Sequence, residues 1–378
     1  MTGAALHGIR VLDLSRVLSG PLCARILADL GAEVVKVEAP GGDDGRHFGP
    51  FVGGTSTFHR LLNRNKFGIT LDLRTQRGRD RLAGLVRGAD VLIENFRPGV
   101  LDRLGFPPEH LLRLNPRLVA VSISGFGRTG PWSDRPAYDL IVQAVSGLMS
   151  VTGPDGGPGV RVGISIGDVV PALYGAVATL SALHERARTG RGQHIDVAMF
   201  DSLISVLESA AMRALYTMDD IVPTGSHHAV SAPYGTFATK DQPVAIAVAS
   251  DALFTRLASV LDRPEWLADR RYGSDADRAR HRDELRRDVE DALAGMTRDE
   301  AITVLSAGGV PCSPVYGIRD ALNHPHTAAR GMIRTEPDGF RTLDVGVRTA
   351  GTVGQFRPAP SLGQHNDLVE DWIHNWRT

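Results

Sequence analysis

The sequence predicts an α/β fold in which a large, doubly wound domain is joined by a smaller α+β domain. Over residues 1–130, short apolar strands alternate with helical patterns, which favours a mostly parallel sheet. Residues 227–250 alternate in the manner of antiparallel strands, and residues 251–320 are mainly helical and rich in charge. The length of 378 residues accommodates two domains.

The N-terminal part begins with a β-α-β pattern. IRVLDLS (9–15) is predicted to be a buried strand, residues 19–32 carry apolar side chains at helical spacing, and EVVKVEAP (33–40) is predicted to be the next strand. The same reasoning predicts further strands at 67–73, 90–96 and 118–127, an amphipathic helix at 74–89, and a short helix at about 100–105.

A lone acid, Asp168, lies in the otherwise apolar or small run RVGISIGDVV (161–170). The following stretch predicts a helix to about residue 188, with Leu173, Val177, Leu180 and Leu183 on one face. Because residues 164–183 contain Asp168, a proline and two glycines, we interpret them as a buried helix and not as a membrane span. A strand at 194–199 and another helix are expected next.

The change of pattern sets the expected domain boundaries. The large domain is predicted over residues 1–224 and is completed by 326–378, and the small domain over 225–325. Helices are expected near 251–261, 279–294 and 298–306, and a last helix near 366–376.

Composition excludes several functional classes. The formal net charge of −1 provides no field that would favour nucleic acid or an anionic membrane, so neither partner is expected. Two cysteines, Cys23 and Cys312, cannot build a disulfide framework and are typical of a reducing cytosol. The N-terminus shows no basic region followed by an apolar core, so no signal peptide is expected, and we predict a cytoplasmic protein.

The doubly wound pattern raises the question of nucleotide binding. The first turn, LSRVLSGP, has no G-x-G-x-x-G fingerprint, and no Walker A sequence is present, which argues against a nicotinamide oxidoreductase. Ligands of open α/β sheets still bind at the carboxyl ends of strands. Those ends are expected at 14–19, 38–43, 95–99 and 124–130.

Several segments match one family together. They include VLDLSRVLSGPLCARILADLGAEVVKVEAP, ADVLIENFRPGVLDRLGF, and the Gly-Asp, apolar helix and TGRGQHIDVAMFDS of residues 160–202. The chain resembles the class III CoA transferases, the family of formyl-CoA:oxalate and carnitine CoA transferases, whose relatives include α-methylacyl-CoA racemases. The resemblance implies a Rossmann-like large domain completed by the C-terminal tail, a small middle domain, and an interlocked homodimer.

The resemblance implies that Asp168 is the nucleophile of an acyl-CoA:carboxylate CoA transferase, acting through a mixed anhydride and an aspartyl-CoA thioester. The residues agree with this, because a helix N-terminus stabilises a carboxylate and would offset desolvation by apolar neighbours. Gly167 would let a thioester carbonyl approach nearby N–H groups. The plain alternative is an aspartate that only begins a helix. An acyl-CoA donor, a carboxylic acid acceptor and a second copy of the chain are the expected partners, with no metal and no cofactor beyond the substrate coenzyme A.

The racemases are the main alternative function. They carry a histidine just upstream of the aspartate, where this chain has Tyr138, so that two bases can exchange the α-proton. A phenol is a poor base at neutral pH but can orient a substrate or donate to an oxyanion. The plain alternative for Tyr138 is a half-buried packing residue. Thirteen histidines occur in the chain, and folding could bring one of them to the site.

The resemblance also implies a CoA pocket. Arginines suit phosphate because the guanidinium forms two bonds at once, although each could simply be a solvated charge. Leu18 replaces the glutamine of formyl-CoA transferases, and no tetraglycine loop is found, which favours an acceptor larger or more apolar than oxalate or formate. His227, His228 and Tyr234 are candidates for the acceptor pocket. A third hypothesis is a CoA-binding protein without chemistry, which would form no adduct with Asp168. The implied CoA contacts are Val17, Leu18, Leu71, Arg74, Asn95, Phe96, Arg97, Arg103 and Leu104.

Overall fold

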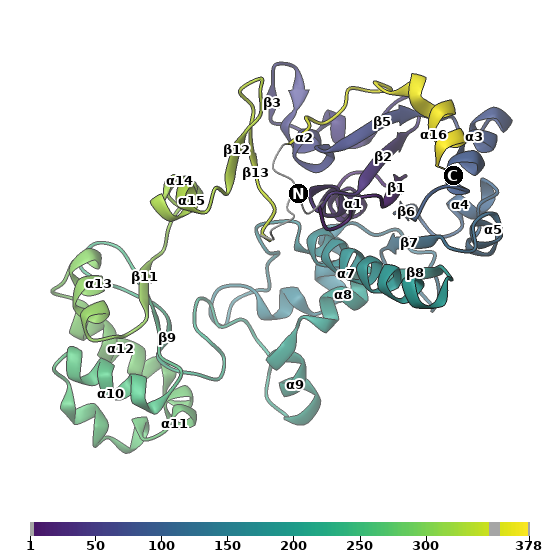
Figure 1. Cartoon of the computed structure of the whole chain (residues 1–378). Helices are drawn as coiled ribbons and strands as arrows, with labels where there is room; N and C mark the ends of the chain where they lie inside the picture. Colours follow the sequence, from purple (N-terminus) through teal and green to yellow (C-terminus); the bar gives the residue numbers. More distant parts are fainter. Residues whose placement is uncertain (1–3, 348–355, 377–378) are drawn as a thin grey trace. The chain divides into compact units, whose positions relative to one another are not determined.

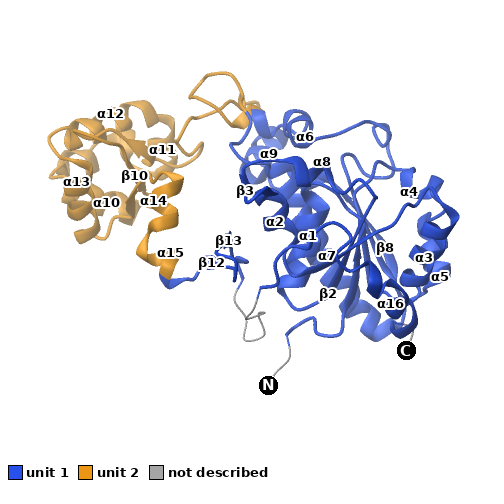
Figure 2. Ribbon diagram, turned by 90° about the horizontal axis from the view of Figure 1, so that it is seen from above, with its two compact units in different colours: residues 1–149, 161–217, 329–378 blue, residues 150–160, 218–328 orange. Residues whose placement is uncertain are grey.

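The computed structural model describes residues 4–347 and 356–376. The chain forms two compact units (Figure 2): unit 1 comprises residues 1–149, 161–217 and 329–378, and unit 2 comprises residues 150–160 and 218–328. The large domain expected from the sequence, 1–224 completed by 326–378, also contained residues 150–160, 218–224 and 326–328, which lie in unit 2. Within unit 2 the Gly156 N–H donates to the Pro223 carbonyl at 3.0 Å.

Unit 1 is built on a six-stranded parallel sheet with the order β5-β2-β1-β6-β7-β8, so the parallel sheet predicted from the sequence is confirmed. The chain starts in the middle, winds outward to one edge, and returns to continue from β1 to the other edge. The strands are β1 (Arg10–Asp13), β2 (Glu33–Glu38), β5 (Lys66–Thr70), β6 (Val91–Glu94), β7 (Val119–Ser124) and β8 (Gln193–Ala198).

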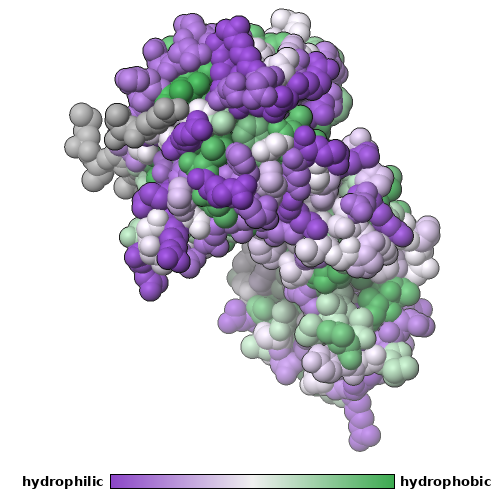
Figure 3. All heavy atoms as spheres, turned by 90° about the vertical axis from the view of Figure 1, so that its right-hand side faces the viewer, coloured by the Kyte–Doolittle hydropathy of each residue, from purple (hydrophilic) through white to green (hydrophobic). Residues whose placement is uncertain are grey.

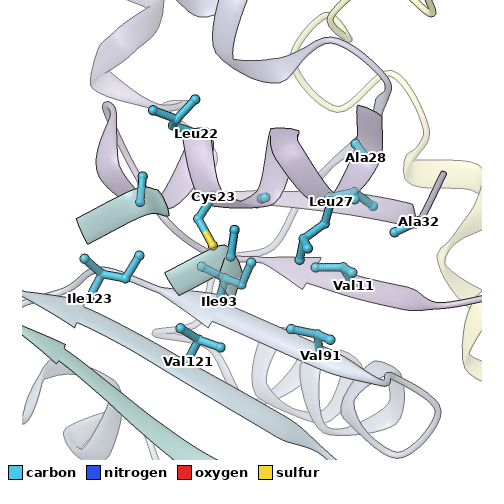
Figure 4. Packing of buried hydrophobic residues seen from close by; sticks show 14 of the residues in the cluster. Val11, Leu22, Cys23, Leu27, Ala28, Ala32, Val91, Ile93, Val121 and Ile123 are labelled. Carbon is cyan, nitrogen blue, oxygen red and sulfur yellow. The ribbon is translucent and has the colours of Figure 1, made fainter. Parts of the chain in front are cut away.

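Helices cover both faces of this sheet (Figure 1). On one face, α1 (Ser19–Asp29) and α7 (Ile166–Thr189) pack on the strands, and Figure 4 shows Leu22, Cys23 and Leu27 of α1 above the strand side chains. On the other face lie α3 (Gln76–Val86), α5 (Pro108–Leu114) and α16 (Val369–Asn375). The C-terminal helix therefore belongs to the core of unit 1.

The face of α7 predicted to be apolar is buried only in its second half, where Leu180 and Leu183 pack against the core of unit 1. Val177 is 62% exposed and Leu173 is 50% exposed, whereas Ala172, Gly175 and Ala176 are buried. A Cβ at Gly175 would lie 3.2 Å from the Cys23 sulfur, so small residues are needed where α7 meets α1. By length and composition α7 could cross a membrane, but its small-residue face is part of the core of unit 1.

Unit 2 contains the antiparallel strands that the sequence predicted. β9 (Tyr234–Phe237), β10 (Val244–Ala247) and β11 (Cys312–Pro314) form one sheet, packed on helices around Phe254, Trp266 and Leu285. The helices are α10 (Asp251–Val260), α11 (Asp275–Arg280), α12 (Arg282–Leu293), α13 (Arg298–Ala307), α14 (Ile318–Asn323) and α15 (Pro325–Ala329, at the unit boundary).

The remaining elements of unit 1 are short and lie between or beside those above. They are β3 (Phe51–Val52), β4 (Thr55–Ser56), α2 (Thr57–Asn63), α4 (Val100–Arg103), α6 (Asp139–Val145), α8 (Met199–Ser205), α9 (Glu208–Tyr216), β12 (Ile333–Thr335) and β13 (Arg341–Leu343).

Candidate active site

The site lies where the strand order reverses, between β1 and β6. In open α/β sheets this is where the loops at the carboxyl ends diverge and leave a crevice. The two loops are joined there by the Asn95 side chain, which accepts from the Arg16 N–H at 2.7 Å and donates to the Arg16 carbonyl at 2.8 Å. The Asn95 amide is thus engaged with the β1–α1 turn, although the residue also lines the cavity described next.

A cavity of about 500 Å³ opens at this point and contains Asp168 and Tyr138. Five of the nine implied CoA contacts line it: Val17, Leu18, Asn95, Phe96 and Arg97. We call it the Asp168 cavity. Its lining comprises residues 16–19, 95–98 and 123–125, with Asp44, Phe48, Val100, Arg135, Ala137, Tyr138, Asp168 and Met199.

A second cavity, of about 430 Å³, shares Arg16 and Phe96 with the first. It is lined by residues 14–16, 37–43 and 71–74, with Phe96 and Leu104, and so contains the implied CoA contacts Leu71, Arg74 and Leu104. Arg103 lines neither cavity. The side chain of Arg74 is 82% exposed and pairs with Asp72 at 2.9 Å, which makes it a solvated charge in the unbound chain.

Asp168 lies in the first turn of α7, half-buried, as the sequence predicted. No hydrogen bond or ion pair to its carboxylate occurs among the described residues of the chain. Burial, and then the nearby charge of Asp139, raise the pKa of Asp168 from 3.8 to about 7. Burial and a neighbouring acid thus both favour the protonated form of Asp168.

Asp139, the first residue of α6, explains why residue 167 is glycine. The Gly167 N–H donates to Asp139 Oδ1 at 2.8 Å, and Gln143 Nε2 donates to both Asp139 oxygens at 2.9 Å. A Cβ at position 167 would lie 2.7 Å from Val142 Cγ2. The glycine thus lets α6 approach α7. Its N–H is bonded to Asp139, so any donor to a substrate carbonyl would be another backbone N–H group, and the approach of a thioester carbonyl at this position stays a prediction.

Tyr138 precedes α6 and lines the Asp168 cavity. Its side chain is 74% exposed in the single chain, so it does not belong to the core of unit 1. None of the described residues that line this cavity is a histidine. The cavity itself therefore offers no imidazole as a second base beside Asp168.

Three guanidinium groups line the Asp168 cavity, those of Arg16, Arg97 and Arg135. Arg16 pairs with Asp44 at 2.6 Å, and the Arg135 guanidinium lies 4.6 Å from the centre of the Trp132 ring. Sequence reasoning missed Arg16, Arg135 and Asp139. The signal available for Asp139 was an acid followed four residues later by a glutamine, a spacing at which helical side chains meet.

The predicted acceptor-pocket residues of the small domain lie in unit 2. The His227 ring packs edge-on against Phe237, and the His228 ring lies against Tyr234. Their role stays a prediction. No group of three or more His, Cys, Asp or Glu side chains that could hold a metal ion occurs within residues 4–347 and 356–376.

Comparison with known proteins decides the family. The sequence model of CoA-transferase family III matches residues 6–366, nearly the whole chain. The chain belongs to CoA-transferase family III. The resemblance drawn from the sequence motifs is thereby confirmed, and so is the assignment of the chain as an enzyme of this class.

Curated family III relatives span most of the chain. The acetyl-CoA:oxalate CoA-transferase of Acetobacter aceti is 43% identical over 86% of this chain and 84% of its own length. The succinate–glutarate CoA-transferase of Agrobacterium fabrum is 38% identical over 96% and 94%, respectively. The succinyl-CoA:mesaconate CoA-transferase of Haloarcula hispanica is 39% identical over 97% and 94%. These names support transfer of CoA to a carboxylate and disfavour the racemase alternative.

Among solved structures, a CaiB/BaiF family protein from Brucella suis superposes with a TM-score of 0.86. It is 36% identical and the match covers 98% of this chain and 100% of the other. This family III enzyme therefore shares the fold of that protein over essentially the full chain.

Proposed function

We propose that this family III enzyme transfers CoA from an acyl-CoA to a dicarboxylic acid, with Asp168 as the nucleophile. The observation that supports this most strongly is the position of Asp168: an acid without a cationic partner among the described residues, in a cavity at the sheet's switch point. A carboxylate that is neither paired nor bonded is available to attack, whereas the paired acids of unit 1 are not.

The proposed chemistry exchanges one thioester for another. The Asp168 carboxylate attacks the acyl-CoA carbonyl, the C–S bond breaks, and a mixed anhydride and the CoA thiolate result. The thiolate attacks the aspartyl carbonyl and releases the donor acid, which leaves an aspartyl-CoA thioester. The acceptor carboxylate attacks this thioester, and the thiolate then attacks the acceptor's carbonyl in the new anhydride. Asp168 returns as a carboxylate, and no metal or redox step is required.

A dicarboxylic acceptor is supported by the charges of the cavity. Three guanidinium groups, of Arg16, Arg97 and Arg135, line it beside the two acids Asp44 and Asp168. One carboxylate of the acceptor must reach Asp168, and a guanidinium can bind the other bidentately. Since apolar side chains also line the cavity, we favour an acid of the size of succinate or glutarate over oxalate.

We further propose a homodimer that works in the cytoplasm. Large apolar side chains of α6–α9 are exposed in the single chain, among them Ile141, Val177, Met212 and Leu215. Figure 3 shows that hydrophobic residues reach the surface among hydrophilic ones. Exposed apolar side chains on successive helices are typical of an interface, and a second copy of the chain is the partner that the family resemblance implies. The free thiols of Cys23 and Cys312 are consistent with a reducing compartment.

The test is a single incubation in D₂O, read by mass spectrometry. The protein is mixed with succinyl-CoA, a methyl-branched acyl-CoA, and oxalate, glutarate and mesaconate. New CoA esters are expected with the wild type and not with Asp168→Ala. The matched control is Asp299→Ala, which removes another aspartate from the first turn of a helix, α13, and should leave ester formation intact.

Two outcomes would contradict the proposal. A one-dalton gain on the branched acyl-CoA without new esters would instead establish the racemase. Binding of CoA with neither new esters nor deuterium uptake would leave a binding protein without chemistry.

A further inference from the structure

The turn between β1 and α1, residues 15–19, contains a backbone conformation that its sequence does not favour. Val17 has φ of +66°, in the left-handed region. A β-branched side chain rarely adopts this region, because its Cβ substituents crowd the backbone. Residues held in such conformations persist only where surrounding contacts over-determine them, and they are concentrated at functional sites.

A buried ion pair holds the turn from one side. The Val17 N–H donates to the Asp43 carboxylate, at 3.0 and 3.3 Å to its two oxygens. Asp43 pairs with Lys36 at 2.7 Å, and the two side chains are only 2% and 1% exposed. The Lys36 ammonium also donates to the Ser15 carbonyl. The pair thus forms hydrogen bonds to the backbone on both sides of Arg16, at Ser15 and Val17.

Asn95 holds the turn from the other side, through the Arg16 N–H and carbonyl bonds described above. Together these contacts satisfy four successive polar groups of the backbone: the carbonyls of residues 15 and 16 and the N–H groups of residues 16 and 17. These hydrogen bonds keep the turn in its conformation while the side chains of Lys36, Asp43 and Asn95 stay in place.

The turn also separates the two cavities. Val17 lines the Asp168 cavity, Ser15 lines the second cavity, and Arg16 lines both. A relaxed Val17 would change the shape of the wall of the Asp168 cavity, next to Arg16, which both cavities share.

We propose that Lys36 and Asp43 are positioning residues, which hold Val17 in the left-handed conformation and so place the reacting end of an acyl-CoA against Asp168. The inference rests on the proposed site at Asp168, since it specifies how that site is shaped. It assigns no contact between the ion pair and the reacting atoms.

The test is a double-mutant cycle of Asp43→Asn and Val17→Gly. Asparagine removes the charge that pairs with Lys36, so we expect kcat to fall about tenfold or more, with a smaller change in KM for the acyl-CoA. Glycine adopts positive φ without help. In the Val17→Gly background, therefore, Asp43→Asn should change kcat by less than about threefold.

The rescue distinguishes positioning from general stabilisation. If Asp43 only stabilised the fold, its loss would cost the same with valine or glycine at position 17, and equal costs would overturn the proposal. Melting temperatures of all four proteins are measured in parallel. An Asp168→Ala variant that kept its activity would refute the nucleophile, and the cycle would still report on the turn.

A second pair of variants leaves the ion pair intact, in case Asp43→Asn does not fold. Val17→Pro cannot reach positive φ and has no N–H to donate, so its kcat should fall about a hundredfold relative to Val17→Gly. A Val17→Pro enzyme as active as Val17→Gly would show that the left-handed conformation is not needed, and would contradict the proposal.

Discussion

Two sets of acids lie beside the β1–α1 turn and have opposite electrostatics. Beneath the turn, Asp43 is buried with Lys36, and although burial alone would raise its pKa, Lys36 lowers it to about 2. Asp13 is buried with Lys66 at 2.8 Å, and its pKa is likewise lowered. Across the cavity, Asp168 has no cation, and its pKa is raised to about 7.

The difference in pKa distinguishes acids that hold the structure in place from the acid that is proposed to react. A carboxylate in a buried ion pair is stabilised as an anion, and its lone pairs are occupied by hydrogen bonds. An acid without a partner is destabilised as an anion and remains available to form a covalent bond. The same residue type thus serves two purposes because of what folding places beside it, and each of the following predictions tests one side of this contrast.

The largest effect is expected at Asp168. Asp168→Ala should lower kcat by about a thousandfold or more, because no other acid in the cavity is unpaired and the covalent route is lost. Binding of CoA, measured by calorimetry, should change little. A variant that lost CoA affinity and kept turnover would show that Asp168 binds the substrate and does not react with it.

The next largest effect is expected beneath the turn. Lys66→Met would leave Asp13 buried without its partner, and removing one member of a buried pair typically costs about 3–5 kcal/mol. Urea unfolding of the wild type and the variant measures this free energy. As a control, Arg298 pairs with Asp299 at the surface, and Arg298→Met should cost less than about 1 kcal/mol. Equal losses of unfolding free energy in the two variants would show that the buried pair stabilises the fold no more than a surface pair does.

A smaller effect is expected on the pH profile. Burial, with the charge of Asp139 added to it, raises the pKa of Asp168, so transfer should increase as pH rises through about 7, where Asp168 ionises. Asp139→Asn removes this charge and keeps an oxygen to accept from the Gly167 N–H. The midpoint of log kcat against pH should therefore move to lower pH. A midpoint that stayed in place would show that Asp139 does not act on Asp168.

The last effect is on the stability of the folded state. Because the folded pKa of Asp168 lies above its unfolded value, the ionised side chain disfavours the folded state at pH 8, and this penalty diminishes as pH falls toward 4. Asp168→Asn should therefore melt at a higher temperature than the wild type at pH 8, with a smaller difference at pH 5. A constant difference would argue against a raised pKa.

Much of the fold could be predicted from sequence, because strands and helices of unit 1 carry their own periodicity. The strand order could not, since it depends on which strands pair across long connections. The buried face of α7 was predicted in part: Leu180 and Leu183 pack against the core, whereas Leu173 and Val177 are exposed, and close packing against Cys23 requires Gly175. Hydrophobicity predicts burial only where the partner element leaves room.

The site was partly predictable. Asp168 and the loops at the strand ends could be found from motif and topology, because one edge of a parallel sheet gathers the carboxyl ends. The role of Asp139, and the left-handed Val17 held by Asp43, depend on contacts between residues 26 or more positions apart. No local pattern in the sequence encodes such contacts.

The central claim is that Asp168 becomes covalently attached to CoA. The measurement is rapid quenching of the enzyme mixed with succinyl-CoA alone, without acceptor, followed by digestion and mass spectrometry of the peptide that contains residue 168. We expect a CoA adduct on Asp168 that disappears when glutarate is added before the quench. An unmodified Asp168 in an enzyme that still converts glutarate to its CoA ester would contradict it.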